Sequence, residues 1–178
     1  RRVEHGPPLR VLFPSVLLAI GVGSAMALLP VFLFVVQPDP WWNPRYIVPI
    51  TGMIVANAMN VVAQVLERLF TSAHSDRAEI EQWLALGATP AQAIARPVRD
   101  ALRAGLIPTI NGLMTVGLVA LPGMMTGQIL SGTAPEHAIR YQLVIMYQLV
   151  IVAAVSGGTA AVMARRALFT SSEQLRSL

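Results

Sequence analysis

Four long apolar stretches restrict what this chain can fold into: residues 11–36, 46–66, 105–130 and 139–164. About 20 helical residues cross the ~30 Å hydrocarbon core of a bilayer, so each stretch is long enough to span one. The 178 residues are 54% hydrophobic and only 12% charged, with a mean hydropathy of +0.60, which exceeds what a soluble domain of this length buries. We therefore expect an all-α, polytopic integral membrane protein with four transmembrane helices in a single domain over residues 1–178.

None of the four apolar stretches has the pattern of a cleavable signal peptide, because no short apolar stretch ends in a small-residue cleavage site, and the given sequence opens on Arg1. We expect the chain to be a piece of a longer protein with further helices at its N-terminus.

The basic residues orient the predicted spans. All thirteen are arginine, and eleven lie before the first stretch, between the second and third, or after the fourth. Only Arg45 and Arg140 fall in the other two connections. The positive-inside rule then places the start, residues 67–104 and the end in the cytoplasm, and Trp41 and Trp42 suit the opposite membrane interface. This use of arginine, for topology and for contact with anionic lipid, also accounts for the pI near 10.6, so we expect no nucleic-acid partner.

Several classes of site are excluded by residues that the sequence lacks. Without lysine there is no Walker A phosphate loop, and without cysteine there is no disulfide, thiolate metal site or cysteine nucleophile. The histidines His5, His74 and His137 are scattered over different connections. We therefore expect no catalytic residue, no resident cofactor and no enzymatic activity in this chain.

Residues 67–104 between the second and third stretches resemble a helical hairpin. Apolar residues repeat at helical spacing beyond residue 66, so the second span is predicted to continue as an amphipathic helix that ends at Gly87. Thr89, Pro90 and Gln92 then have the spacing of a capping box with proline at the first helical position. Two interpretations stay open, a simple hairpin and a docking element for a cytosolic partner.

A Pro-Gly pair, Pro122 and Gly123, interrupts the third apolar stretch. Irregular backbone at membrane depth survives only where it is buried in protein or lines a wet cavity, because an unpaired backbone group in hydrocarbon costs several kcal/mol. The alternative is that the pair ends a helix near the interface.

Polar side chains within the spans form two helical stripes, one on the second span and a shorter one on the third. Because polar groups facing lipid are costly, the stripes are expected to point inward, either as interhelical hydrogen bonds or as a route for a solute. Of the residues around the Pro-Gly pair and on the second span, Asn57, Met124 and Met125 are the predicted transient metal contacts, since neutral oxygens and thioethers bind a metal without trapping it. The full predicted pathway is Met53, Asn57, Asn60, Gln64, Glu67, Asn111, Thr115, Pro122, Gly123, Met124, Met125 and Thr126.

Five segments in order, residues 50–60, 84–93, 106–111, 121–130 and 138–142, together resemble the FetB-like family of ABC transporter permeases. The resemblance implies about three further N-terminal spans. It also implies a separate FetA-like ATPase, which would bind the ATP and Mg, and a role in bacterial iron export, with plant relatives implicated in aluminium tolerance.

A second resemblance, to the cytoplasmic loop of ABC importers, assigns ATPase docking to the hairpin turn. Residues 81–87 have the spacing of the Glu-Ala-Ala and Gly pair in the cytoplasmic loop of many ABC importers, but Gln82 and Trp83 replace the alanines and Asp100 replaces the expected proline. The importer analogy therefore covers only the turn. The predicted docking residues are Glu81, Leu86, Gly87, Ala88, Thr89 and Pro90.

The sequence thus predicts a permease subunit in the bacterial inner membrane, paired as a homodimer with two ATPases and exporting iron or a related metal. Two other functions stay open: a secondary transporter driven by an ion gradient, and a membrane scaffold or sensor that transports nothing. The exact substrate and the direction of transport are also left open.

Overall fold

A computed structural model of the chain describes residues 9–36, 44–116, 122–169 and 174–175. The described residues are helical except for short turns and an isolated bridge between Phe169 and Leu175, which confirms the all-α prediction for this part of the chain. The elements are α1 (Leu9–Pro30), the π-helix η1 (Val31–Val36), α2 (Pro44–Ser75), α3 (Arg77–Ala85), α4 (Pro90–Ala93), α5 (Ala95–Thr115), α6 (Gly123–Leu130) and α7 (Pro135–Leu168).

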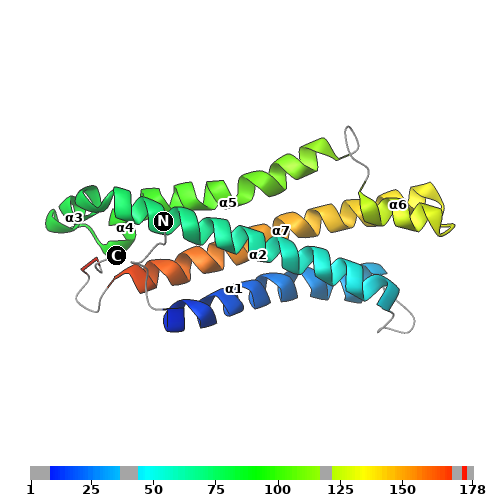
Figure 1. Ribbon diagram of the computed structural model, residues 1–178, viewed down its shortest axis with the longest axis horizontal. Coiled ribbons are helices and arrows are strands. Elements are labelled where there is room, and N and C mark those ends of the chain that lie inside the picture. The colour runs from blue at the N-terminus through cyan, green and yellow to red at the C-terminus, as the bar shows by residue number, and fades with distance from the viewer. Residues whose placement is uncertain (1–8, 37–43, 117–121, 170–173, 176–178) are drawn as a thin grey trace.

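The long helices form an elongated bundle around α2 and α7 (Figure 1). These two helices pack on each other, α1 packs against both, and α5 packs against both as well. The short helices α3 and α4 lie at one end of the bundle, and α6, which packs on α7, lies at the other. We call these the hairpin end and the α6 end.

Three helical segments of the described residues are long and apolar enough to cross a membrane: Leu12–Phe34, Tyr46–Ser75 and Pro135–Leu168. The prediction of four transmembrane helices is therefore wrong for the stretch 105–130. There α5 ends at Thr115 and a separate helix of 8 residues, α6, begins at Gly123. The Pro-Gly pair starts a new helix instead of continuing the old one, and α5 by itself begins with polar sequence that carries Arg96, Arg99, Asp100 and Arg103.

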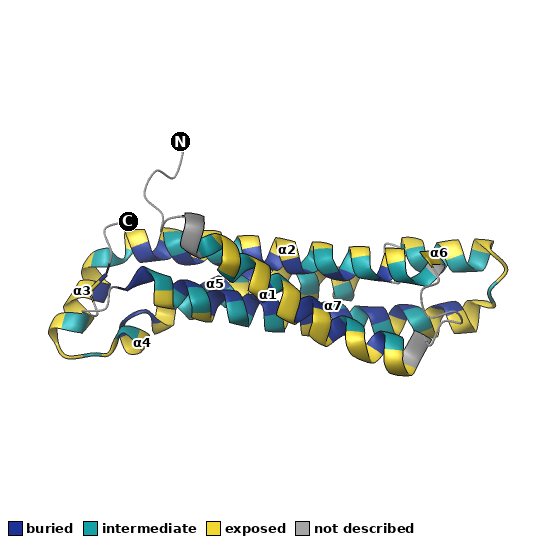
Figure 2. Ribbon diagram, turned by 90° about the horizontal axis from the view of Figure 1, so that it is seen from below, coloured by how far each residue is buried: buried dark blue, intermediate teal, exposed yellow. Residues whose placement is uncertain are grey.

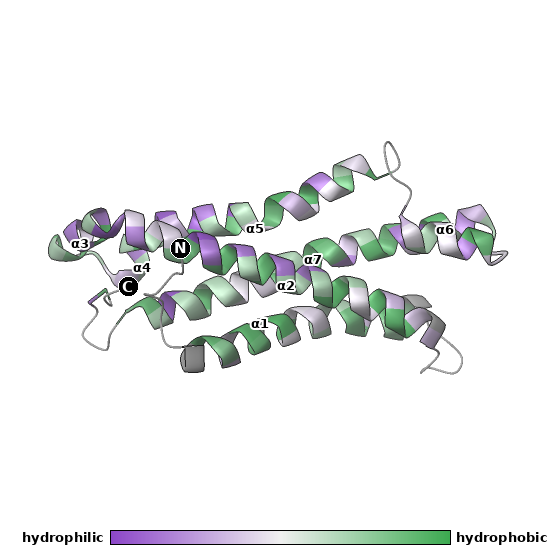
Figure 3. Ribbon diagram, viewed as in Figure 1, coloured by the Kyte–Doolittle hydropathy of each residue, from purple (hydrophilic) through white to green (hydrophobic). Residues whose placement is uncertain are grey.

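The outward face of α1 is apolar. Large side chains such as Phe13, Leu17 and Leu29 on α1 are more than half exposed, and Figure 2 shows exposed positions along much of this helix. Figure 3 shows that the residues of α1 are largely hydrophobic, whereas hydrophilic residues gather around α3, α4 and the start of α5. Such a surface suits hydrocarbon, and the chain is an integral membrane protein.

Small residues let the central helices approach closely. A Cβ on Gly105 of α5 would lie 2.5 Å from Val65 Cγ2 of α2, and one on Gly23 of α1 would lie 2.8 Å from Ser156 Cβ of α7. Gly157 of α7 faces the same part of α2, with a built Cβ 3.0 Å from Val61 Cγ1. Helices in membranes associate through such close packing, because the hydrophobic effect does not drive helices together in lipid, which is as apolar as their side chains.

The hairpin differs from its prediction at one point. The helix from α2 does not run unbroken to Gly87, because it breaks at Asp76, and α3 follows as a separate helix. The capping box is confirmed: Thr89 Oγ1 accepts from the Gln92 backbone N–H, and the Gln92 side chain accepts from the Thr89 N–H. Buried Ile80, Ala93 and Ile94 join the hairpin to the same core as α2, α5 and α7.

Candidate functional site

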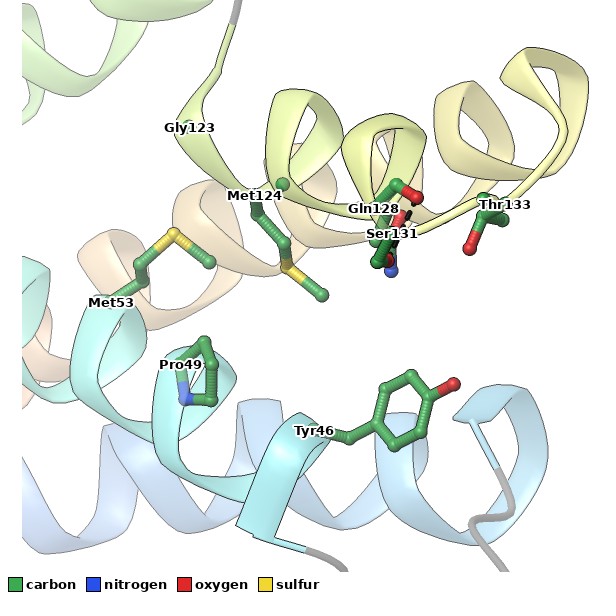
Figure 4. A pocket seen from close by; sticks show the side chains of 10 residues that line it. Tyr46, Pro49, Met53, Gly123, Met124, Gln128, Ser131 and Thr133 are labelled. Atoms are coloured by element: carbon green, nitrogen blue, oxygen red, sulfur yellow. Dashed lines mark hydrogen bonds between the residues drawn. The ribbon is translucent and has the colours of Figure 1, made fainter.

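A pocket of about 620 Å³ lies at the α6 end, between the first turns of α2, the helix α6 and the turn that leads into α7. Residues of α2 form one wall of the pocket, and residues of α6 form the opposite wall (Figure 4). Its lining consists of Tyr46, Pro49, Met53, Gly123, Met124, Gly127, Gln128, Ser131, Gly132 and Thr133.

The pocket presents thioether sulfur and neutral oxygen. Figure 4 shows the side chains of Met53 and Met124 reaching into the space between α2 and α6 from opposite walls. Gln128 lies one turn beyond Met124 on α6, and its Oε1 is buried with no hydrogen-bond partner among the described residues. A buried amide oxygen without a partner is costly in an apolar setting.

This donor set suits passage better than storage. Among the described residues, no group of three or more His, Asp or Glu side chains could hold a metal ion. Thioethers and neutral oxygens bind soft-to-borderline cations weakly, and weak sites are needed where an ion must leave again.

The structure brings three of the predicted pathway residues together here: Met53, Gly123 and Met124. The other α6 candidates, Met125 and Thr126, do not line the pocket, and Thr126 donates from its N–H and hydroxyl to the Pro122 carbonyl at 3.1 and 3.2 Å. Thr126 therefore satisfies the backbone at the start of α6.

Sequence reasoning missed most of the pocket wall. Tyr46, Pro49 and Met53 follow the spacing i, i+3, i+7, which marks one face of a helix and was a usable signal. Gln128 shares a face with Met124 in the same way. The turn residues Ser131 to Thr133 had no such signal, because only the fold places them against α2.

Asn57 lies one turn beyond Met53 and ties three helices together. Its Nδ2 donates to the Leu149 carbonyl of α7 at 2.9 Å, and its Oδ1 accepts from the Thr109 hydroxyl of α5 at 3.1 Å. This geometry favours the interhelical alternative for this residue. A role in transit stays a prediction.

The remaining polar residues of the two stripes do not reach this pocket. On α2, Asn60 and Glu67 are exposed and Gln64 is half-buried, while Asn111 and Thr115 are exposed on α5. The Thr115 hydroxyl donates to carbonyls of its own helix, those of residues 111 and 112. Their place on a pathway stays a prediction.

Two glutamines of α7 also escaped the sequence analysis. Gln142 and Gln148 are buried, and the Oε1 of each has no hydrogen-bond partner among the described residues. Amides in the middle of an apolar stretch were the signal that could have found them.

The predicted docking turn protrudes from the hairpin end. Leu86 is 83% exposed, Gly87 has a φ of +88°, and Trp83, which the prediction left out, is 52% exposed. Ala88 to Pro90 complete the turn into α4, and Glu81 is held by Arg77, with Nε 2.8 Å from Oε1. Large exposed apolar residues on a hydrophilic end of the molecule are typical of a protein contact.

Some predicted features lie outside the described residues. These include the tryptophans Trp41 and Trp42, and residues 117–121 of the predicted third stretch.

Comparison with known proteins gives a consistent family. The sequence profile described as "Uncharacterised protein family (UPF0014)" matches residues 2–169. The chain is 41% identical over 174 residues to the UPF0014 membrane protein slr1647 of Synechocystis, covering 98% of this chain and 67% of that protein. It is 39% identical over 163 residues to the probable iron export permease protein FetB of Escherichia coli, covering 92% and 62%. The Protein ALUMINUM SENSITIVE 3 of Arabidopsis thaliana is 38% identical over 160 residues, covering 90% and 58%.

The chain thus spans about three fifths to two thirds of the length of these relatives. The predicted resemblance to FetB-like permeases is confirmed. No solved structure gives a significant match to the chain.

Proposed function

This chain belongs to the UPF0014 family of membrane proteins, and from that premise we propose that it is the permease subunit of an ABC transporter that exports iron or a related metal across a bacterial cytoplasmic membrane. The observation that carries the proposal is the 39% identity to a protein named as an iron export permease, over 92% of this chain. The chain itself then has no catalytic site, and a separate FetA-like ATPase supplies the energy.

In this proposal the hairpin end lies in the cytosol, and α5 and α6 together make the fourth crossing. The 8 residues of α6 extend about 12 Å, and this length adds to that of the apolar second half of α5 in the proposed crossing. The basic residues Arg68, Arg77, Arg96, Arg99 and Arg103 support the orientation, because they lie on α2, α3 and α5 at the hairpin end.

The ATPase docks on the turn between α3 and α4. Leu86 and Trp83 supply an exposed apolar contact, and the positive φ of Gly87 keeps the turn tight. Because Ile80 and Ile94 of the hairpin pack in one core with Leu69 of α2, a push on the turn moves α2 and α5 with it. Two such subunits would form a homodimer with two ATPases.

The metal passes through the pocket at the α6 end. Met53 and Met124 would contact it from opposite walls, and Gln128, which also lines the pocket, would add an uncharged amide. Since these ligands are uncharged, the ion is exchanged instead of held.

The test is metal-stimulated ATP hydrolysis by the permease reconstituted with its ATPase. We expect Met124→Leu to raise the metal concentration needed for half-maximal stimulation by about tenfold, the equivalent of one lost contact of about 1.4 kcal/mol. Methionine to leucine nearly conserves volume, so stability should change little. Met125→Leu is the matched control, because Met125 is the next residue of α6 but does not line the pocket.

The ATPase contact is tested separately by Leu86→Ser. This exposed side chain is expected to leave the melting temperature unchanged while the ATPase no longer co-purifies. Equal effects of Met124→Leu and Met125→Leu would show that the metal does not pass through this pocket. If the ATPase still co-purifies with Leu86→Ser, the docking site is not at this turn.

A further inference from the structure

A second cavity, of about 400 Å³, lies at the hairpin end between the first turns of α5 and the last turns of α7. Three arginines line it: Arg99 and Arg103, one turn apart on α5, and Arg165 on α7. Its apolar wall consists of Val98, Leu102 and Leu106. The proposed transport route does not use this cavity, which lies at the opposite end from the pocket of Met53 and Met124.

The three guanidinium groups have no ion-pair partner among the described residues. The ion pairs at this end involve other arginines, since Arg77 binds Glu81, and Arg96 Nη1 lies 3.7 Å from Glu79 Oε1. No acidic residue of the described chain lines the cavity. Three like charges around one space repel each other, so an anion bound among them would be stabilised.

The order of residues along α5 indicates what kind of anion fits. Ala95, at the first residue of the helix, lies at the end nearest the hairpin, Arg99 and Arg103 follow, and Leu106 lies two turns, or about 10 Å, beyond Arg99 toward the apolar middle of the bundle. Val98 and Leu102 each directly precede an arginine, so the apolar and the charged faces of the cavity run side by side along α5, and only Leu106 lies deeper than both arginines. A soluble phosphate would use only the charged face, whereas a phospholipid has a phosphate for that face and an acyl chain for the apolar face that continues to Leu106.

We propose that this cavity binds one anionic phospholipid, with its headgroup phosphate on Arg99, Arg103 and Arg165 and an acyl chain along Val98, Leu102 and Leu106. Basic pockets between helices at a membrane surface are suited to such headgroups. The lipid would join α5 to α7 next to the hairpin. The proposal rests on membrane insertion alone, so it stands or fails independently of the metal and the ATPase.

The experiment is native mass spectrometry of the purified chain in detergent, titrated with dioleoyl phosphatidylglycerol or with dioleoyl phosphatidylcholine, which carries the same chains. We expect one phosphatidylglycerol to bind at least tenfold more tightly than phosphatidylcholine. Arg103→Gln should weaken the binding of phosphatidylglycerol by about fivefold, since each basic residue at a membrane surface contributes about fivefold to the affinity for an anionic lipid. The triple variant, with Gln in place of Arg99, Arg103 and Arg165, should remove the preference for phosphatidylglycerol over phosphatidylcholine.

Arg166→Gln is the matched control, because Arg166 neighbours Arg165 on α7 but does not line the cavity. It should leave the preference within twofold of the parent. The single variants keep the test valid if the triple variant does not fold. An excess of glycerol 3-phosphate distinguishes the two sources of phosphate: failure to displace the lipid supports the proposal, and full displacement overturns it in favour of a soluble anion. An unchanged preference in Arg103→Gln, or an equal loss in Arg166→Gln, also overturns it.

Discussion

The two hydrogen bonds of Asn57 allow a quantitative test of how the bundle is held together. Asn57→Ala removes both the bond to the Leu149 carbonyl and the bond from the Thr109 hydroxyl. Interhelical hydrogen bonds in membranes average about 0.6 kcal/mol, so the free energy of unfolding should fall by about 1.2 kcal/mol. For a chain of this size, that loss lowers the melting temperature by roughly 2–5 °C.

The pairwise part of this loss can be isolated with Thr109→Val, which removes only the hydroxyl. Alone, this change should cost about 0.6 kcal/mol, and in the Asn57→Ala background it should cost nothing, because its partner is already gone. The assay is reversible unfolding of the parent chain, the two single variants and the double variant in detergent micelles, monitored by tryptophan fluorescence or far-UV circular dichroism.

Asn60→Ala is the matched control. Asn60 is the same residue type, less than one turn along α2, but it is exposed and makes no hydrogen bond with another described residue. Its substitution should change the free energy of unfolding by less than about 0.5 kcal/mol. Equal effects at residues 57 and 60, or additive effects of Asn57→Ala and Thr109→Val, would refute the assigned geometry.

Three further predictions follow from the same structure. Gly105→Ala should destabilise the bundle by about 1–3 kcal/mol in a thermal melt, because the added Cβ would lie 2.5 Å from a neighbouring methyl group, whereas Gly112→Ala, with open space around it, should be neutral or stabilising. Thr89→Ala should cost about 1 kcal/mol of local stability by removing the capping box, visible as faster hydrogen exchange in α4 but not in α7. In the cysteine-free chain, Ser75→Cys should resist an impermeant maleimide added to intact cells while Ala134→Cys is labelled, and the reverse pattern would invert the proposed topology.

Local sequence patterns determined the class of this protein. Apolar stretches of membrane-spanning length and the placement of arginine require only chain composition and periodicity, and both were sufficient to predict a helical membrane protein. The capping box of Thr89 was equally predictable, because its partners are three residues apart. The Pro-Gly pair predicts an interruption of the third stretch, and α6 begins at Gly123.

Only the tertiary structure decided which residues share a site. Met53 and Met124 lie 71 positions apart in the sequence and meet because α2 and α6 pack on the same cluster beside α7. The same packing turned Asn57 toward Leu149 and Thr109, left Asn60 exposed, and gathered Arg165 with Arg99 and Arg103. A helical period states which residues of one helix share a face, but the rotation of that face toward a neighbour is set by close contacts such as Gly105 on Val65, between residues that no local pattern connects.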